Sequence, residues 1–211
     1  MALSKKALAA MKSILENRHH AWLAAEMAII ANTSQKTVYK VANDLLGKGI
    51  LSKDRSGLHK LERPDELRLH LENITRRPEG RPYFAPDTPE YFARRIEDVT
   101  KERGLKHSFT GQLGLWAYHQ HLQPVRAELY VEERRMKDWA RVLENDNLCI
   151  PSPPSRASVI IIPTNDPYPF LRTSLIDGYR VPQFVQVYLD CIAYGARLAE
   201  GARYAWRIVY P

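Results

Sequence analysis

The sequence contains very little cysteine and no long apolar run. Cys149 and Cys191 are its only cysteines, too few for a disulfide framework and without the spacing of a zinc site. The longest apolar stretch, residues 159–163, is far shorter than the roughly 20 residues that cross a bilayer. Lysines interrupt the apolar residues of the first 17 positions, so no secretory signal is expected there. We therefore predict a cytoplasmic protein that does not bind membranes.

Motifs that mark common enzyme classes are also missing. The chain has no Walker phosphate loop, no G-x-G-x-x-G turn and no G-x-S-x-G elbow, so these nucleotide-binding and hydrolase classes are not indicated. His119 and His121 form a His-x-His pair at an expected helix end, where histidine suits the helix dipole. No third ligand is close in sequence. We predict no metal site and no cofactor.

Basic residues exceed acidic ones, and the excess is concentrated near the N-terminus. The chain has 31 Lys and Arg against 24 Asp and Glu, a formal net charge of +7. Residues 1–80 hold 14 basic and 9 acidic side chains, whereas residues 81–211 hold 17 and 15. A local basic surface of this kind favours a polyanionic partner such as nucleic acid.

The N-terminal region has the pattern of three helices followed by a β-hairpin. Ser4 and Ser34 are suitable N-caps for the first and third helices, and Gly47 ends the third. Apolar residues recur at the spacing of one helix face in all three. The expected helices cover residues 4–17, 21–31 and 35–46, and the expected strands cover 50–53 and 58–61.

This order of elements resembles the winged helix-turn-helix family. The matching positions are Ser34, Thr37, Val38, Leu45, Gly49, Ile50 and Leu51. The resemblance implies that residues 1–63 form a DNA-binding domain, with the third helix in the major groove and the hairpin as its wing. Some winged helices bind proteins instead, so a protein-interaction adaptor is an alternative.

The predicted DNA contacts are polar and basic side chains of the third helix, the turn before it and the hairpin. Gln35 and Asn43 can pair with adenine, whereas Lys36 and Lys40 suit guanine or phosphate. Hydroxyl groups bind phosphates and fix the register on the duplex. The full predicted set is Thr33, Ser34, Gln35, Lys36, Thr37, Tyr39, Lys40, Asn43, Lys53, Arg55 and Lys60. The predicted partner is double-stranded DNA.

The rest of the chain is predicted to be a linker and a second domain. Residues 64–89 are rich in proline and charge and include one short helix at 65–74, so they are interpreted as a linker. Residues 90–211 mix helices and strands, which indicates a mixed α/β domain with a small sheet and an α+β fold class for the whole chain. The expected helices cover 89–103, 113–119, 136–145 and 185–207, the last one long and C-terminal. The expected strands cover 127–132, 158–163 and 175–179, and residues 107–111 are expected to be a short strand or a turn.

Three stretches of the second domain resemble the C-terminal domain of AbiEi-type proteins, the antitoxin and regulator half of type IV toxin–antitoxin operons. They are residues 109–117, residues 128–131 and residues 181–191. The final helix matches at Gln186, Tyr188, Leu189, Asp190, Gly195, Arg197, Glu200 and Ala202, but residues 191–194 depart from the aliphatic pattern of the family. The resemblance implies a repressor of its own operon, paired with a nucleotidyltransferase-like toxin. A homodimer on DNA is one option for its oligomeric state.

An alternative from the enzyme class is a metal-dependent nuclease that the N-terminal domain targets to DNA. Its candidate carboxylates are Glu128, Glu132, Glu133 and Asp177, but no E-x-K sequence follows a strand, which favours a protein that is not an enzyme. In the last helix, Asp190 is expected to be a buried structural carboxylate. Arg197 and Glu200 are expected to form an i, i+3 ion pair.

Overall fold

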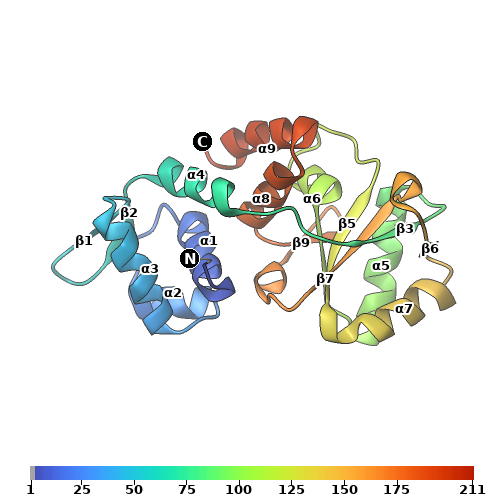
Figure 1. Cartoon of the computed structure of the whole chain (residues 1–211), viewed down its shortest axis with the longest axis horizontal. Coiled ribbons are helices and arrows are strands. Elements are labelled where there is room, and N and C mark those ends of the chain that lie inside the picture. The colour runs from blue at the N-terminus through green and yellow to red at the C-terminus, as the bar shows by residue number, and fades with distance from the viewer. Residues whose placement is uncertain (1–2) are drawn as a thin grey trace. The chain divides into compact units, whose positions relative to one another are not determined.

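In the computed structural model, which describes residues 3–211, the secondary structure forms two separate units. The first unit ends at Thr75 and the second begins at Arg76. Helices and one hairpin make up the first unit, and helices around a five-stranded sheet make up the second (Figure 1). The predicted α+β class with small sheets is therefore confirmed.

Four helices and a hairpin build the first unit. They are α1 (Lys5–Glu16), α2 (Ala24–Ile30), α3 (Gln35–Gly47), β1 (Leu51–Lys53), β2 (His59–Leu61) and α4 (Pro64–Ile74). The core is formed by apolar side chains of the helices, such as Met11, Met27 and Leu45, all of which are buried. α4 packs against α1 and buries Leu67 and Leu71, so this helix is part of the first unit rather than of a linker.

The second helix begins three residues later than the sequence pattern predicts. Trp22 does not continue the helix because its backbone N–H and C=O pair with those of His59 on β2. The two rings also stack, with their centroids 4.7 Å apart. This pairing joins residues 37 positions apart, which a local helical period does not reveal.

The second unit is built on a five-stranded sheet in the order β4-β5-β7-β3-β6. Its strands are β3 (Arg81–Phe84), β4 (His107–Thr110), β5 (Ala127–Glu132), β6 (Ile150–Pro151) and β7 (Val159–Thr164). β5 and β7 are parallel in a register that runs from Ala127 opposite Val159 to Glu132 opposite Thr164, and the other pairs are antiparallel. A parallel pair needs a long crossover, which contains α7 (Met136–Asn145).

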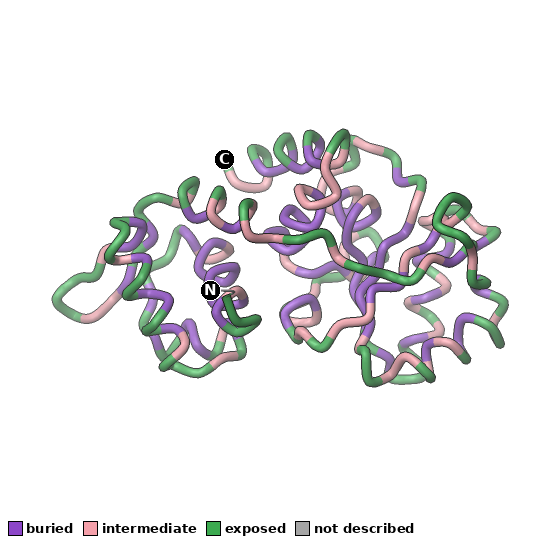
Figure 2. The backbone as a smooth tube through the Cα atoms, viewed as in Figure 1, coloured by how far each residue is buried: buried purple, intermediate pink, exposed green. Residues whose placement is uncertain are grey.

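The remaining elements surround this sheet. They are α5 (Pro89–Arg103), α6 (Gly111–Tyr118), η1 (Glu133–Arg135), η2 (Pro154–Arg156), η3 (Tyr168–Phe170), the hairpin β8 (Ser174–Ile176) and β9 (Tyr179–Val181), and the helices α8 (Phe184–Tyr194) and α9 (Ala196–Val209). Buried residues concentrate in the central strands, as the purple tube in Figure 2 shows. Phe109, Leu129 and Ile161 from three neighbouring strands join Phe92 and Trp139 from α5 and α7 in one apolar core.

Three predictions for this unit are wrong. Residues 81–84 are a sheet strand rather than linker, and they pair with both β6 and β7. The expected strand at 175–179 is a hairpin, because Asp177 and Gly178 both have positive φ and form the turn that Asp-Gly favours. The long C-terminal helix is two helices, because Gly195 has φ 75° and ψ −168°, which no helix continues through.

Candidate nucleic-acid interface

Helix α3 begins at a hydrogen-bonded cap. The Ser34 hydroxyl accepts a hydrogen bond from the Thr37 backbone N–H at 3.2 Å, and the two side-chain oxygens lie 2.9 Å apart. One face of the helix is then buried in the unit through Val38, Val41 and Leu45. The cap and this apolar face fix which side chains α3 turns toward solvent.

The solvent face of α3 is basic and polar. Lys36, Lys40 and Asn43 are exposed at the i, i+4, i+7 spacing of one helix face. Tyr39 lies beside them with 46% of its surface exposed. At Gly47 an added Cβ would meet no atom within 4 Å, so the C-terminal end of this face is open as well. The face can therefore be approached closely by a large partner.

The hairpin presents two further cations beside a carboxylate that is held in the turn. Asp54 accepts hydrogen bonds from the Ser56 hydroxyl at 2.7 Å and from the Leu58 backbone N–H at 3.0 Å. The Ser56 bond is the main cause that lowers the pKa of Asp54. Lys53 and Arg55 flank this residue and are exposed. Asp54 thus stays ionised and shapes the turn that carries Arg55.

The carboxylates of Asp44 on α3 and of Glu62, which follows β2, also have partners within the unit. Asp44 pairs with Lys48 at 2.7 Å, one turn along α3. Glu62 accepts a hydrogen bond from Ser52 at 2.7 Å and lies 3.7 Å from Lys60. By contrast, four cations form no ion pair with any residue from 3 to 211: Lys36, Lys40, Lys53 and Arg55. The surface of α3 and the hairpin therefore carries uncompensated positive charge.

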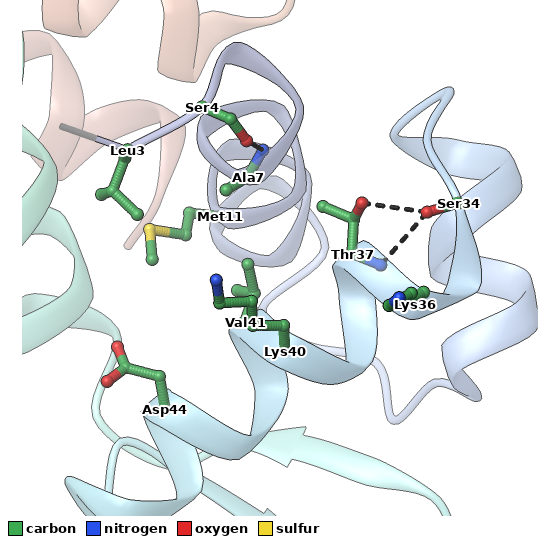
Figure 3. Close-up of a pocket in the computed structure, with 10 residues that line it drawn as sticks. All are labelled: Leu3, Ser4, Ala7, Met11, Ser34, Lys36, Thr37, Lys40, Val41 and Asp44. Atoms are coloured by element: carbon green, nitrogen blue, oxygen red, sulfur yellow. Dashed lines mark hydrogen bonds between the residues drawn. The ribbon is translucent and has the colours of Figure 1, made fainter. Parts of the chain in front are cut away.

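A groove of about 510 Å³ runs between α1 and α3 (Figure 3). The first turns of both helices line it, and Ser4 caps α1 by accepting a hydrogen bond from the Ala7 N–H at 3.2 Å. Neither first turn contains an acidic residue; they contain Lys5, Lys6 and Lys36 instead. Cations at a helix N-terminus oppose the helix dipole by about 0.3–1 kcal/mol each. Such a placement is favourable when an anion binds there.

The predicted contact residues differ in how far they are exposed to solvent. Ser34, Gln35, Lys36, Tyr39, Lys40, Asn43, Lys53, Arg55 and Lys60 are exposed, and Thr37 is half-buried at the cap. Thr33 is also half-buried, and its hydroxyl oxygen is enclosed without a hydrogen-bond partner among the described residues. That oxygen therefore does not face solvent with the others.

The sequence pattern did not reveal how the hairpin is attached. His59, on β2, is buried against Trp22 by the ring stacking and the paired backbones described above. Burial is the main cause that lowers the pKa of His59, and nearby Lys53 lowers it further, against smaller opposing effects of Trp22 and Asp54. A neutral imidazole is thus part of the support that holds the hairpin against the segment before α2.

Two carboxylates of the second unit, Asp190 and Glu128, are buried. The Asp190 carboxylate accepts hydrogen bonds from the Thr110 hydroxyl at 2.6 Å, from the Tyr130 hydroxyl at 3.0 Å and from the Gln186 amide at 2.9 Å. All four side chains are buried. This cluster ties β4, β5 and α8 together, as expected for a structural carboxylate.

A second buried carboxylate, Glu128, holds the start of α6. It accepts hydrogen bonds from the Gln112 backbone N–H at 2.9 Å and from Arg126 at 2.7 Å. Burial raises the pKa of Glu128, and Arg126 opposes that rise. Gly111 has φ 58°, and a Cβ there would come within 2.6 Å of the Glu128 carboxylate. Glu128 therefore serves as a cap and requires glycine beside it.

The remaining candidates of the second unit are dispersed. Asp177 is exposed in the β8–β9 turn and accepts a hydrogen bond from Gln120, whereas Glu128 is buried on β5. The predicted Arg197–Glu200 ion pair is absent from the ion pairs of residues 3–211, and both side chains point to solvent on α9. Among the same residues, no three His, Cys, Asp or Glu side chains gather in a way that would hold a metal ion.

No helix within the described residues is long and apolar enough to cross a membrane. Comparisons of the chain with protein-family models, with curated proteins and with solved structures found no match.

Proposed function

We propose that this protein is a duplex-DNA-binding transcriptional regulator and that its first unit is a winged helix-turn-helix domain. The observation that carries the proposal is the exposed face of α3, on which Lys36 and Lys40 have no ionic partner among the described residues. Each carboxylate of α3 and of the hairpin is engaged within the fold. Free cations on one helix face are what the phosphates of a duplex attract.

In this proposal α3 lies in the major groove. Asn43 and Gln35 are the residues that read adenine, because a side-chain amide can both donate to and accept from its major-groove edge. The N-terminal turns of α1 and α3 bind phosphates through their free N–H groups and through Lys5 and Lys6. Arg55 at the hairpin turn enters the neighbouring minor groove.

The biological role that we propose is repression of a toxin–antitoxin operon by its own antitoxin, in the cytoplasm. The support for it is the AbiEi-like pattern of residues 109–202, which follows the proposed DNA-binding unit in the order that the family uses. The proposed partner is a nucleotidyltransferase-like toxin. A reporter fused to the operon's promoter tests this role, because expression should fall when the chain is supplied and recover with Lys36→Gln plus Lys40→Gln.

A salt-dependent duplex-binding experiment tests the DNA-binding proposal itself. Affinity for duplex DNA falls as salt rises, and each phosphate contact adds about 0.9 to the steepness of log affinity against log salt concentration. We expect the double variant Lys36→Gln plus Lys40→Gln to be less steep by about 1.8. The matched control is Lys101→Gln plus Lys137→Gln, which removes the same charge from two exposed lysines of the second unit. An equal loss in both double variants would show that only net charge matters and would contradict the proposed interface.

A further inference from the structure

The groove between α1 and α3 combines two kinds of surface. Its floor is apolar: Ala7, Met11 and Val41 line it, and each is less than a tenth exposed. Leu3 forms an apolar lip and is 44% exposed. Figure 3 shows Leu3 and Met11 on one side of the groove and Ser34 and Lys36 on the opposite side, with Lys40 between them. The groove is therefore apolar on one side and polar on the other.

Its charges are those of an anion-binding site. Lys36 and Lys40 line the groove, and neither is paired with a carboxylate among residues 3–211. Asp44 also lines it, but its carboxylate is engaged by Lys48 at 2.7 Å. The N-terminal turns of two helices add partial positive charge to the same space. The lining thus favours a ligand that is negatively charged at one end.

The size of the groove indicates a small molecule. A volume of about 510 Å³ lies within the range of ligand pockets, which is roughly 300–1,000 Å³. An apolar floor with two unpaired lysines in the same lining matches an aliphatic chain that ends in a carboxylate. The aliphatic part would cover Met11 and Leu3, and the carboxylate would lie between Lys36 and Lys40.

We propose that this groove binds a small aliphatic carboxylate, which competes with DNA for Lys36 and Lys40. The competition rests on the proposed function, because the same ammonium groups are assigned to phosphates there. The ligand releases the protein from DNA without any change in fold, since a lysine paired with a bound carboxylate no longer attracts a phosphate. The groove is thus an effector site within the DNA-binding surface.

Direct binding is measured by calorimetric titration of the whole chain with decanoate, in the absence of DNA. Acetate, which keeps the charge, and decanol, which keeps the chain, should each bind at least about tenfold more weakly. Leu3→Asn removes the apolar lip at an exposed position, so the fold is retained and decanoate affinity should fall about tenfold. Equal binding of decanol and decanoate, or an unchanged affinity in Leu3→Asn, would overturn the assignment.

Competition is measured by adding decanoate to the duplex-binding experiment. We expect at least a tenfold loss of DNA affinity in the unmodified chain and less than a twofold loss in Leu3→Asn, whose own DNA affinity should be unchanged. If the chain binds decanoate in the groove but binds no DNA, the proposed function fails and the ligand site stands. If it binds DNA and decanoate does not weaken that binding, the effector proposal fails alone.

Discussion

The cations of α3 and the hairpin in the first unit and two carboxylates of the second unit are placed in opposite ways. In the first unit, Lys36, Lys40 and Arg55 point to solvent without ionic partners among the described residues. In the second, Asp190 and Glu128 are buried and their oxygens accept hydrogen bonds from several elements. An exposed, unpaired charge contributes little to stability and is available to a partner, whereas a buried, paired one is costly to disturb. These cations of the first unit are therefore open to a partner, whereas these carboxylates of the second unit stabilise its interior.

The largest expected effect is on the interior of the second unit. Asp190→Ala removes a buried acceptor of Thr110, Tyr130 and Gln186, and only Gln186 keeps another acceptor of this cluster, the Tyr130 hydroxyl. We expect the second unit to lose about 3–5 kcal/mol of stability, because each unsatisfied buried group costs about 1–3 kcal/mol and some relax. Hydrogen exchange of β4 and β5 measures the loss. Unchanged protection of these strands would show that the cluster is not structural.

The next effect is a pH dependence confined to the first unit. The folded pKa of His59 is lowered, so the unfolded chain binds more protons than the folded one below the unfolded pKa of 6.5. Stability is therefore full above pH 6.5 and falls as the pH drops toward the folded pKa, with a slope of at most about 1.4 kcal/mol per pH unit. Hydrogen exchange of β1 and β2 at pH 7 and pH 5 checks this.

His59→Phe is the matched control for that measurement. Phenylalanine keeps an aromatic ring against Trp22 and the backbone pairing of β2, but it does not titrate. The dependence of stability on pH that is assigned to His59 should disappear in this variant. If the pH dependence of the hairpin persists unchanged in His59→Phe, another group is responsible.

A smaller effect is expected at the tip of the hairpin. Arg55 is exposed and forms no ion pair with residues 3–211, so Arg55→Gln should leave the stability of the first unit within about 0.5 kcal/mol. Under the proposed function, the salt dependence of duplex binding in Arg55→Gln should be less steep by about 0.9. Urea unfolding and salt-dependent binding measure the two quantities. A large stability loss would mean that the hairpin charges are structural, as those of the second unit are.

The smallest effect is a gain of stability. Gly47 lies at the end of α3, and an added Cβ would meet open space. Gly47→Ala should stabilise the first unit by up to about 1 kcal/mol, because alanine loses less backbone entropy in a helix. Hydrogen exchange of the backbone amides in the second unit should not change. Destabilisation instead would show that the open end of α3 needs glycine for its backbone conformation.

Local patterns predicted much of the secondary structure. The cap at Ser34, the apolar spacing of α3 and the glycine that ends it identified this helix to within one residue. The structure also has the predicted bounds of α5, which begins at a Thr88 cap with Pro89 in its first turn. Interactions within a few residues determine these features, so the sequence alone contains them.

Features that depend on distant partners were not predictable in this way. β3 has only four residues, one of them Pro82, so it is not recognised as a strand until β7 and β6 pair with it. Two other features also join segments far apart in the chain. They are the stacking of His59 on Trp22 and the hydrogen bonds that Asp190 accepts from Thr110 and Tyr130.

The sequence by itself thus determined where most helices begin and end and where positive charge is concentrated, because neighbouring residues decide both. Only the tertiary structure decided which of those charges remain free. Asp44, Asp54 and Glu62 are used within the fold, whereas Lys36 and Lys40 are left beside an apolar groove. Charge pairing and groove shape are set by which surfaces of α1 and α3 meet, and that depends on how the whole unit packs.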